Sequence, residues 1–166
     1  MKHFIFPKAT LILLMASIFS FTKAQTTDVV KIGGTLTKPY ELTLADLQKM
    51  PRVKVSRKNQ DSSTFQYTGV LLSTILEKGG ATLGKDLRRD NLTKYVIIEA
   101  IDGYQVIFAL AELDADFTDE KIILADTVDN EPLLATEGPF RIIVEHDKRP
   151  ARCIKQVTSI KIAFAK

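Results

Sequence analysis

The chain has 166 residues, of which 45% are hydrophobic and 26% are charged, and its formal net charge is +3. This length is typical of one domain whose hydrophobic core is large enough to fold without disulfides. Cys153 is the only cysteine, which excludes a disulfide within the chain. We expect its thiol to be a buried structural group.

The first 24 residues have the pattern of a secretory signal peptide. Lys2 and Lys8 form a basic start, residues 9–21 are almost wholly apolar, and Ala24 is a small residue at the expected cleavage site. The apolar run is shorter than the roughly 20 residues that span a bilayer. We therefore expect export to the periplasm or the medium, with residues 25–166 as a single domain that has no membrane span.

The signal segment also changes the charge of the exported chain. It carries three Lys and no acidic residue, so the remaining chain has 20 basic and 20 acidic side chains. A net charge of zero does not indicate a nucleic-acid partner. The segment contains no arginine, whereas folded, cofactor-loaded proteins leave through a twin-arginine signal. The sequence thus predicts export as an unfolded chain.

Two helices and four strands are expected in the first half of the exported chain. Thr43 begins the first helix as an N-cap, with Asp46 close to a capping-box position, and Pro51 ends it. Gly69 begins the second helix, and Gly79-Gly80 marks its C-terminal end. The expected strands cover residues 29–36, 40–42, 53–57 and 64–67.

A β-hairpin is the clearest element of the second half. Residues 95–101 and 104–110 are apolar runs separated by Asp102-Gly103, a pair that favours a type I′ turn because it tolerates positive φ. The other expected elements are a helical turn at 111–117, a loop at 126–131, and strands at 122–125, 140–144 and 154–164. Many short strands with two or three short helices predict an α+β fold with mixed, mainly antiparallel sheets.

Four segments occur in an order that is informative as a whole. They read GTLTKPYELTLADLQKMP, YTGVLLSTILEKGG, EAIDGYQVIFALAEL and EPLLATEGPFRIIVEHDKRPARCIKQVTSIKI. In this order they resemble the oxidoreductase molybdopterin-binding domain, the fold of sulfite oxidases and their bacterial relatives. The resemblance covers residues 32–162 and implies a sulfite-oxidase-like fold for the whole domain.

The resemblance also implies a molybdenum–pterin enzyme whose metal is bound by a cysteine thiolate, from the loop after the strand at 53–57. This stretch contains Ser56 and no cysteine, and Cys153 lies in the Arg-Cys-Ile-Lys stretch at the start of the last expected strand. A serine hydroxyl could replace the thiolate as an oxygen ligand. A surface hydroxyl in a loop is the simpler interpretation of Ser56.

Three further positions are compared with the family's pattern. Lys155 matches a lysine that helps to hold the pterin phosphate in many relatives, although the Trp that follows it there is Gln156 here. Arg141 adds positive charge that a phosphate would need. Glu137 stands where many relatives have histidine, and it is either structural or an acid in the expected cleft. The candidate cofactor-binding residues are Ser56, Glu137, Arg141 and Lys155, and no metal ligand or catalytic residue is assigned.

Other residues that suggest a function have simpler explanations. His146 lies in a charged turn without partners at the spacing of metal ligands. Asp102 is explained as a turn-forming residue of the Asp-Gly pair, and the acidic residues at 114–120 do not match the spacing of a calcium loop. No Ser-His-Asp triad, Cys-His pair or glycine-rich phosphate loop can be assembled from the sequence.

Two functions are compatible with these observations. The first is an exported binding module of the molybdopterin-binding fold, without a cofactor, that holds an unknown small ligand or an exported partner protein. The second is a molybdopterin-dependent oxidoreductase, or a subunit of one, that binds the cofactor without a protein thiolate. The sequence favours the first, because the metal-ligating cysteine, the Trp and the twin-arginine signal are all missing.

Overall fold

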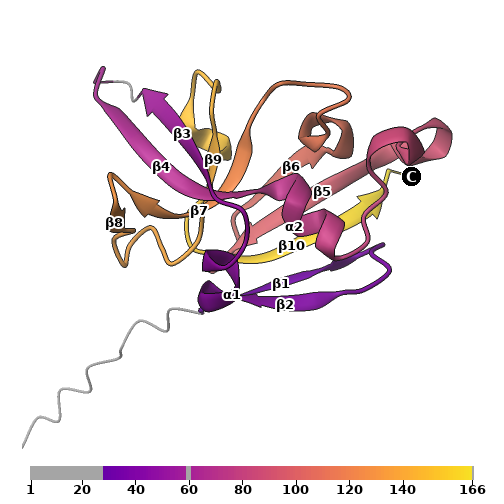
Figure 1. Ribbon diagram of the computed structural model, residues 1–166, viewed down its shortest axis with the longest axis horizontal. Coiled ribbons are helices and arrows are strands. Elements are labelled where there is room, and N and C mark those ends of the chain that lie inside the picture. The colour runs from indigo at the N-terminus through magenta and orange to yellow at the C-terminus, as the bar shows by residue number, and fades with distance from the viewer. Residues whose placement is uncertain (1–27, 59–60, 166) are drawn as a thin grey trace, which may run out of the picture.

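The computed structural model describes residues 28–58 and 61–165, and the expected signal peptide with its cleavage site lies outside them. Figure 1 shows two sheets, one containing β1, β2 and β10 at the lower right and the other containing β3, β4 and β8 at the upper left. None of the helices in the described part of the chain has the length and hydrophobicity needed to cross a membrane.

Within the described residues, ten strands form two five-stranded sheets. The first has the order β2-β1-β10-β5-β6, in which only β1 and β10 run parallel. The second has the order β3-β4-β7-β8, with β9 also on β7, and every pair is antiparallel. The strands are β1 Val29–Gly34, β2 Tyr40–Thr43, β3 Val53–Lys58, β4 Thr64–Leu71, β5 Lys94–Ala100, β6 Gln105–Ala109, β7 Ile122–Val128, β8 Glu131–Pro132, β9 Arg141–Val144 and β10 Val157–Phe164. The expected α+β fold with mixed, mainly antiparallel sheets is confirmed.

The first helix begins as the sequence indicates. In α1, Leu44–Gln48, the N-cap is Thr43, whose Oγ1 accepts a hydrogen bond from the backbone N–H of Asp46 at 3.1 Å. The same hydroxyl donates to the Asp46 carboxylate at 2.7 Å. Thr43 and Asp46, three positions apart, thus satisfy each other's polar groups at the helix start. For this reason the local sequence pattern was sufficient to predict where α1 begins.

The second helix begins later than expected. Gly69 does not open it, because β4 continues to Leu71 and α2 covers Leu72–Lys78. Gly69 lies inside the sheet, paired with Val53 on one side and Ala125 on the other. A Cβ at this position would run into the backbone carbonyl of Leu124. The glycine is therefore needed for the close approach of β7, and it is not a helix signal.

Substitution of Gly69 tests this interpretation. We expect Gly69→Ala to lower the free energy of unfolding by about 2–3 kcal/mol, because the added methyl group forces β4 and β7 apart. Gly33→Ala is the matched control, since a Cβ there meets nothing within 4 Å. Urea denaturation measures both, and equal stabilities of the two variants would contradict the assignment.

The type I′ turn occurs at a different hairpin from the one expected. The turn at Asp102-Gly103 is not type I′, because Gly103 alone has a positive φ, of 83°. Ala100 accepts a hydrogen bond from Gly103 and donates one to Tyr104, which is the pattern of a three-residue loop with a bulge. The type I′ geometry occurs instead in the expected loop at 126–131, where Asp129 and Asn130 both have positive φ between β7 and β8.

The chain between β8 and β10 differs most from the expected elements. It also supplies much of the lining of the candidate functional site described below. β8 and β9 both pair with β7, so the loop at 133–140 bulges out between them. The last strand begins at Val157 rather than Ile154. A short 3₁₀ helix, Pro150–Arg152, precedes it, and the Ile154 carbonyl accepts a hydrogen bond from Ile142 of β9. The segment before β10 therefore lies against β9.

The hydrophobic core joins both sheets and α2. All four residues of β9 are buried, and α2 buries Leu72, Ile75 and Leu76. Phe140, directly before β9, is fully buried and fixes the end of the 133–140 loop. This packing gives the polar residues on either side of β9 a rigid support.

Candidate functional site

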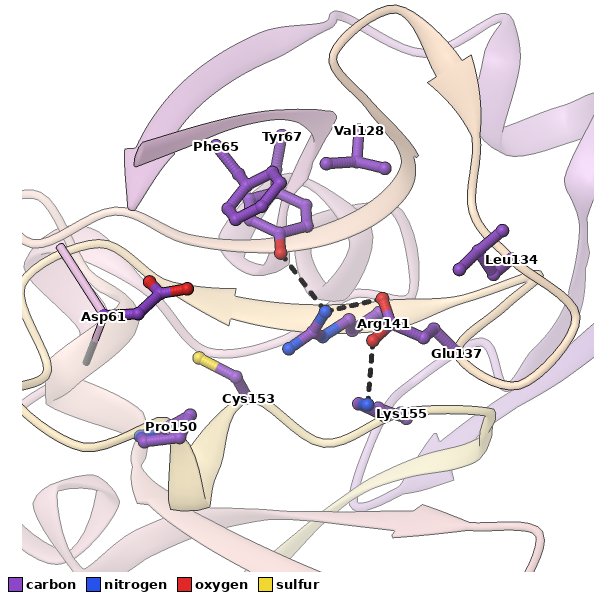
Figure 2. A pocket seen from close by; sticks show the side chains of 10 residues that line it. All are labelled: Asp61, Phe65, Tyr67, Val128, Leu134, Glu137, Arg141, Pro150, Cys153 and Lys155. Atoms are coloured by element: carbon purple, nitrogen blue, oxygen red, sulfur yellow. Dashed lines mark hydrogen bonds and ion pairs between the residues drawn. The ribbon is translucent and has the colours of Figure 1, made fainter. Parts of the chain in front are cut away.

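A pocket of about 660 Å³ opens where β4, the 133–140 loop, β9 and the segment before β10 meet. Figure 2 shows its lining side chains, and Phe65 and Tyr67 lie on the same side of β4 because alternate residues of a strand share a face. The pocket is lined by Asp61, Phe65, Tyr67, Val128, Leu134, Glu137, Arg141, Pro150, Cys153 and Lys155.

The centre of the pocket is an ion network built around Glu137. Its Oε2 accepts a hydrogen bond from Nη1 of Arg141 at 2.7 Å, and its Oε1 pairs with Nζ of Lys155 at 2.7 Å. Nη1 of Arg141 also donates to the hydroxyl of Tyr67 at 3.2 Å, as the dashed lines in Figure 2 show. One carboxylate thus engages both cations of the pocket.

The backbone holds Glu137 in this position. Its N–H donates to the carbonyl of Leu134 at 2.8 Å, and its carbonyl accepts from the N–H of Gln156 at 2.9 Å. The second bond ties the loop that carries Glu137 to the segment that carries Lys155. The network therefore does not depend on long, freely rotating side chains alone.

The guanidinium of Arg141 is the most enclosed charge of the pocket. The residue is 8% exposed, and its Cζ lies 5.3 Å from the centre of the Tyr67 ring. Its Nε is buried and has no hydrogen-bond partner among the described residues. A buried cation needs a counter-ion, and Glu137 supplies it, while one donor stays unsatisfied.

The surroundings shift two pKa values in opposite directions. Burial tends to raise the pKa of Glu137, but the hydrogen bond from Lys155 and the charge of Arg141 outweigh it and hold this pKa below its ordinary value. Burial raises the pKa of Tyr67, against the opposing charge of Arg141. At neutral pH the pocket therefore contains an ionised Glu137 and a neutral Tyr67.

The lowered pKa of Glu137 makes stability depend on pH. The unfolded chain binds a proton at Glu137 more readily than the folded chain does, so this contribution to stability is present above the ordinary pKa of 4.5 and is lost as pH falls through the folded value. We expect the stability advantage of the wild type over Glu137→Gln to be constant from about pH 6 to 8 and to shrink below pH 4.5. Urea denaturation of both proteins across this range measures it. An advantage that grows towards acid would contradict the assignment.

Cys153 also belongs to this pocket, not to the strand in which the sequence placed it. It follows the 3₁₀ helix Pro150–Arg152 and is 4% exposed. Its Sγ accepts a hydrogen bond from the N–H of Val144 at 3.5 Å, and Figure 2 shows the sulfur facing the cavity. Burial of the thiol is confirmed, and its structural role stays a prediction.

The structure brings together three of the four predicted site residues. Glu137, Arg141 and Lys155 line the pocket, whereas Ser56 does not. Ser56 lies on the exposed face of β3, opposite Gln66, because the alternation of the strand turns its two neighbours inward. Sequence reasoning missed Tyr67 and Cys153 as pocket residues. Two signals were available. Alternation in β4 places Tyr67 on the same face as Phe65, and Cys153 is only two positions before Lys155.

The remaining candidates make local contacts. His146 is exposed, and its Nδ1 lies 3.0 Å from Oε2 of Glu120. Asp102 accepts a hydrogen bond from the backbone N–H of Tyr104 within its turn. Asp114 accepts from the backbone of Gly84 and of Asp116. Between residues 28 and 165, leaving out 59–60, no group of three or more His, Cys, Asp or Glu side chains has the arrangement of a metal site.

Comparison with known proteins gives a family match and similar solved structures. The family model described as "Oxidoreductase molybdopterin binding domain" matches residues 21–165. The fold is similar to that of a solved structure, "Crystal Structure of the Sulfane Dehydrogenase SoxCD from Paracoccus pantotrophus", with a TM-score of 0.65 and 17% sequence identity. This likeness covers 82% of the chain and 38% of that chain, and at such an identity it concerns the fold alone. No curated protein matches the sequence.

Proposed function

Because the chain belongs to the oxidoreductase molybdopterin binding domain family, we propose that it is an exported binding member of this family that holds a small organic ligand, without a molybdenum cofactor, in the pocket around Arg141. The observation that carries this proposal is the use of Glu137 as counter-ion to both Arg141 and Lys155.

The charges of the pocket do not fit a pterin phosphate. Such a group carries negative charge and needs several cationic donors that are free to bind it. The ionisable side chains in the lining, cysteine and tyrosine apart, are two cations, Arg141 and Lys155, and two acids, Asp61 and Glu137. Their charges cancel, and Glu137 already pairs with both cations. We therefore derive no reaction step through a molybdenum cofactor.

The walls of the pocket fit an uncharged organic molecule. Phe65, Val128, Leu134 and Pro150 supply apolar surface, and the volume of about 660 Å³ lies within the roughly 300–1,000 Å³ typical of ligand sites. The polar groups converge at one end of the pocket, on Arg141. Apolar walls with a few convergent polar groups are the usual composition of a site for a small molecule.

The expected signal peptide supports the same proposal. A signal without arginine directs the chain out of the cell before it folds, so the exported chain folds where no cofactor is inserted. A small ligand is preferred over an exported protein partner because Arg141, on which the polar groups converge, is only 8% exposed.

A screen of small organic compounds tests the binding site. We expect compounds with an apolar body and one carbonyl group to shift the NMR signals of the wild type, and Leu134→Arg to abolish these shifts by blocking the pocket. Leu92→Arg is the matched control, because Leu92 is also an exposed leucine but lies outside the pocket. Compounds that bind all three proteins equally, or a screen without any binder, would argue against this site.

A second candidate function is a molybdopterin-dependent oxidoreductase, or a subunit of one. One observation favours it: Cys153 lines the pocket, so a soft thiol ligand is present there although none follows the strand at 53–57. This reading requires stoichiometric molybdenum in the wild-type protein and its loss in Cys153→Ser.

A further inference from the structure

We propose that Glu137 is an internal anion that excludes oxyanions such as phosphate, sulfate and phosphate esters from the pocket, so that the pocket accepts uncharged ligands. This inference rests on the proposed binding function and makes the class of ligand more specific. Glu137 would then be a specificity-determining residue of the site.

The geometry of Glu137 is that of a bound oxyanion. Its two carboxylate oxygens each accept from one cation, Arg141 and Lys155, at 2.7 Å. Two oxygens of a phosphate or sulfate would need the same two donors, because charge-assisted bonds from Arg and Lys are the strong contacts of such ions. A free oxyanion must therefore compete with a carboxylate that is already in place.

The main chain that carries the carboxylate is held in place. Hydrogen bonds of the Glu137 backbone to Leu134 and Gln156 fix it on both sides, so only a side-chain rotation could move the carboxylate aside. If it did move, the guanidinium of Arg141, which is 8% exposed, would lose its only described carboxylate partner. The other buried cation nearby, Arg57, is not in the lining, and its Nη1 donates to the carbonyl of Val144 at 2.6 Å. Arg57 thus adds no third cation to the lining that could compensate an incoming anion.

A neutral ligand can use the donors that Tyr67 and Glu137 leave free. Nη1 of Arg141 serves Tyr67 and Glu137, its Nε is buried without a partner, and its Nη2 makes no hydrogen bond among the described residues. A single acceptor, such as a carbonyl oxygen, satisfies a single donor without adding charge. An anion would instead add negative charge to a pocket whose charged side chains already cancel, which is unfavourable.

The test is the binding of inorganic phosphate and sulfate to wild type, Glu137→Gln and Glu137→Ala, measured by calorimetry and by NMR at neutral pH. Both variants should bind these ions at least about tenfold more tightly than the wild type, because the two cations are released. Glu145→Gln is the matched control: the Glu145 side chain is 17% exposed, close to the 21% of Glu137, and it pairs with Lys121 outside the pocket. It should behave as the wild type does. Adding Lys155→Met to Glu137→Gln should remove the gain.

Two results would overturn the inference. One is a wild type that binds phosphate as tightly as Glu137→Gln. The other is a pair of Glu137 variants that bind no better than Glu145→Gln. Should either variant be only marginally folded, phosphate is expected to raise its Tm, and an unchanged Tm counts against the inference. Failure here is distinct from failure of the proposed function, because these titrations use no organic ligand and no molybdenum.

Discussion

Replacement of Glu137 by leucine is expected to lower the free energy of unfolding by about 3–5 kcal/mol, because it leaves a buried guanidinium without its counter-ion. Arg141 is 8% exposed, so water has little access to its charge. When one partner of a buried ion pair is removed, the desolvation penalty of the remaining charge is no longer compensated. Chemical denaturation of the wild type and Glu137→Leu measures the loss.

Lys155 provides the contrasting substitution. It makes an equally short bond to Glu137, but its side chain is 50% exposed. Partly exposed ion pairs contribute little, so Lys155→Leu should cost less than about 1 kcal/mol. The double variant Glu137→Leu with Arg141→Leu should recover part of the loss, because no unpaired charge remains. Equal costs for the Glu137 and Lys155 variants, or simple additivity in the double variant, would show that Arg141 does not depend on Glu137.

Local signals predicted the elements whose structure is decided locally. The start of α1 is an example, since Thr43 and Asp46 satisfy one another within one turn. Gly69 is the opposite case. Its role is set by the backbone of Leu124, which is distant in sequence, so a rule about glycine and helix starts could not identify it. Long-range packing decided that position, and local propensity did not.

The hairpin turns show how several local solutions compete. Asp102-Gly103 suits a type I′ turn, but the strands are joined there by a three-residue loop that needs positive φ at Gly103 alone. Asp129 and Asn130 form the type I′ turn without any glycine. Residue type permits a turn, and the register of the flanking strands selects it.

The candidate site was predicted in part, through the resemblance to the family. Glu137, Arg141 and Lys155 are adjacent because the 133–140 loop, β9 and the segment before β10 converge. Ser56 followed the same reasoning but lies on the outer face of β3. Cys153 could not be placed, because the expected strand at 154–164 begins only at Val157. The pairing of Glu137 with both cations depends on how these segments fold together, so the sequence pattern could not predict it.

The likeness in fold does not by itself transfer an activity. The chain spans 38% of the length of the sulfane dehydrogenase chain, and the identity is 17%. The same fold supports different functions when the residues of the site differ. In this chain the residues that decide the matter are Glu137, which neutralises the pocket, and Cys153, the one thiol in its wall.

Molybdenum and pterin content is where the two candidate functions differ most. The full-length precursor and a form beginning at residue 25 should both be purified from a host that makes the cofactor. The shorter form folds in the cytoplasm, so it tests the pocket separately from the route of export. A family enzyme of known metal content, produced in the same host, controls for cofactor supply.

The deciding measurement is elemental analysis of both forms, combined with fluorescence of the oxidised pterin. We predict molybdenum and pterin far below one per chain in both, because Glu137 occupies the cations that an anionic cofactor needs. Molybdenum and pterin near one per chain in the exported protein would contradict the proposal and establish the oxidoreductase. Loading of the shorter form alone would also contradict the charge argument, and Cys153→Ser would then show whether the thiol holds the metal.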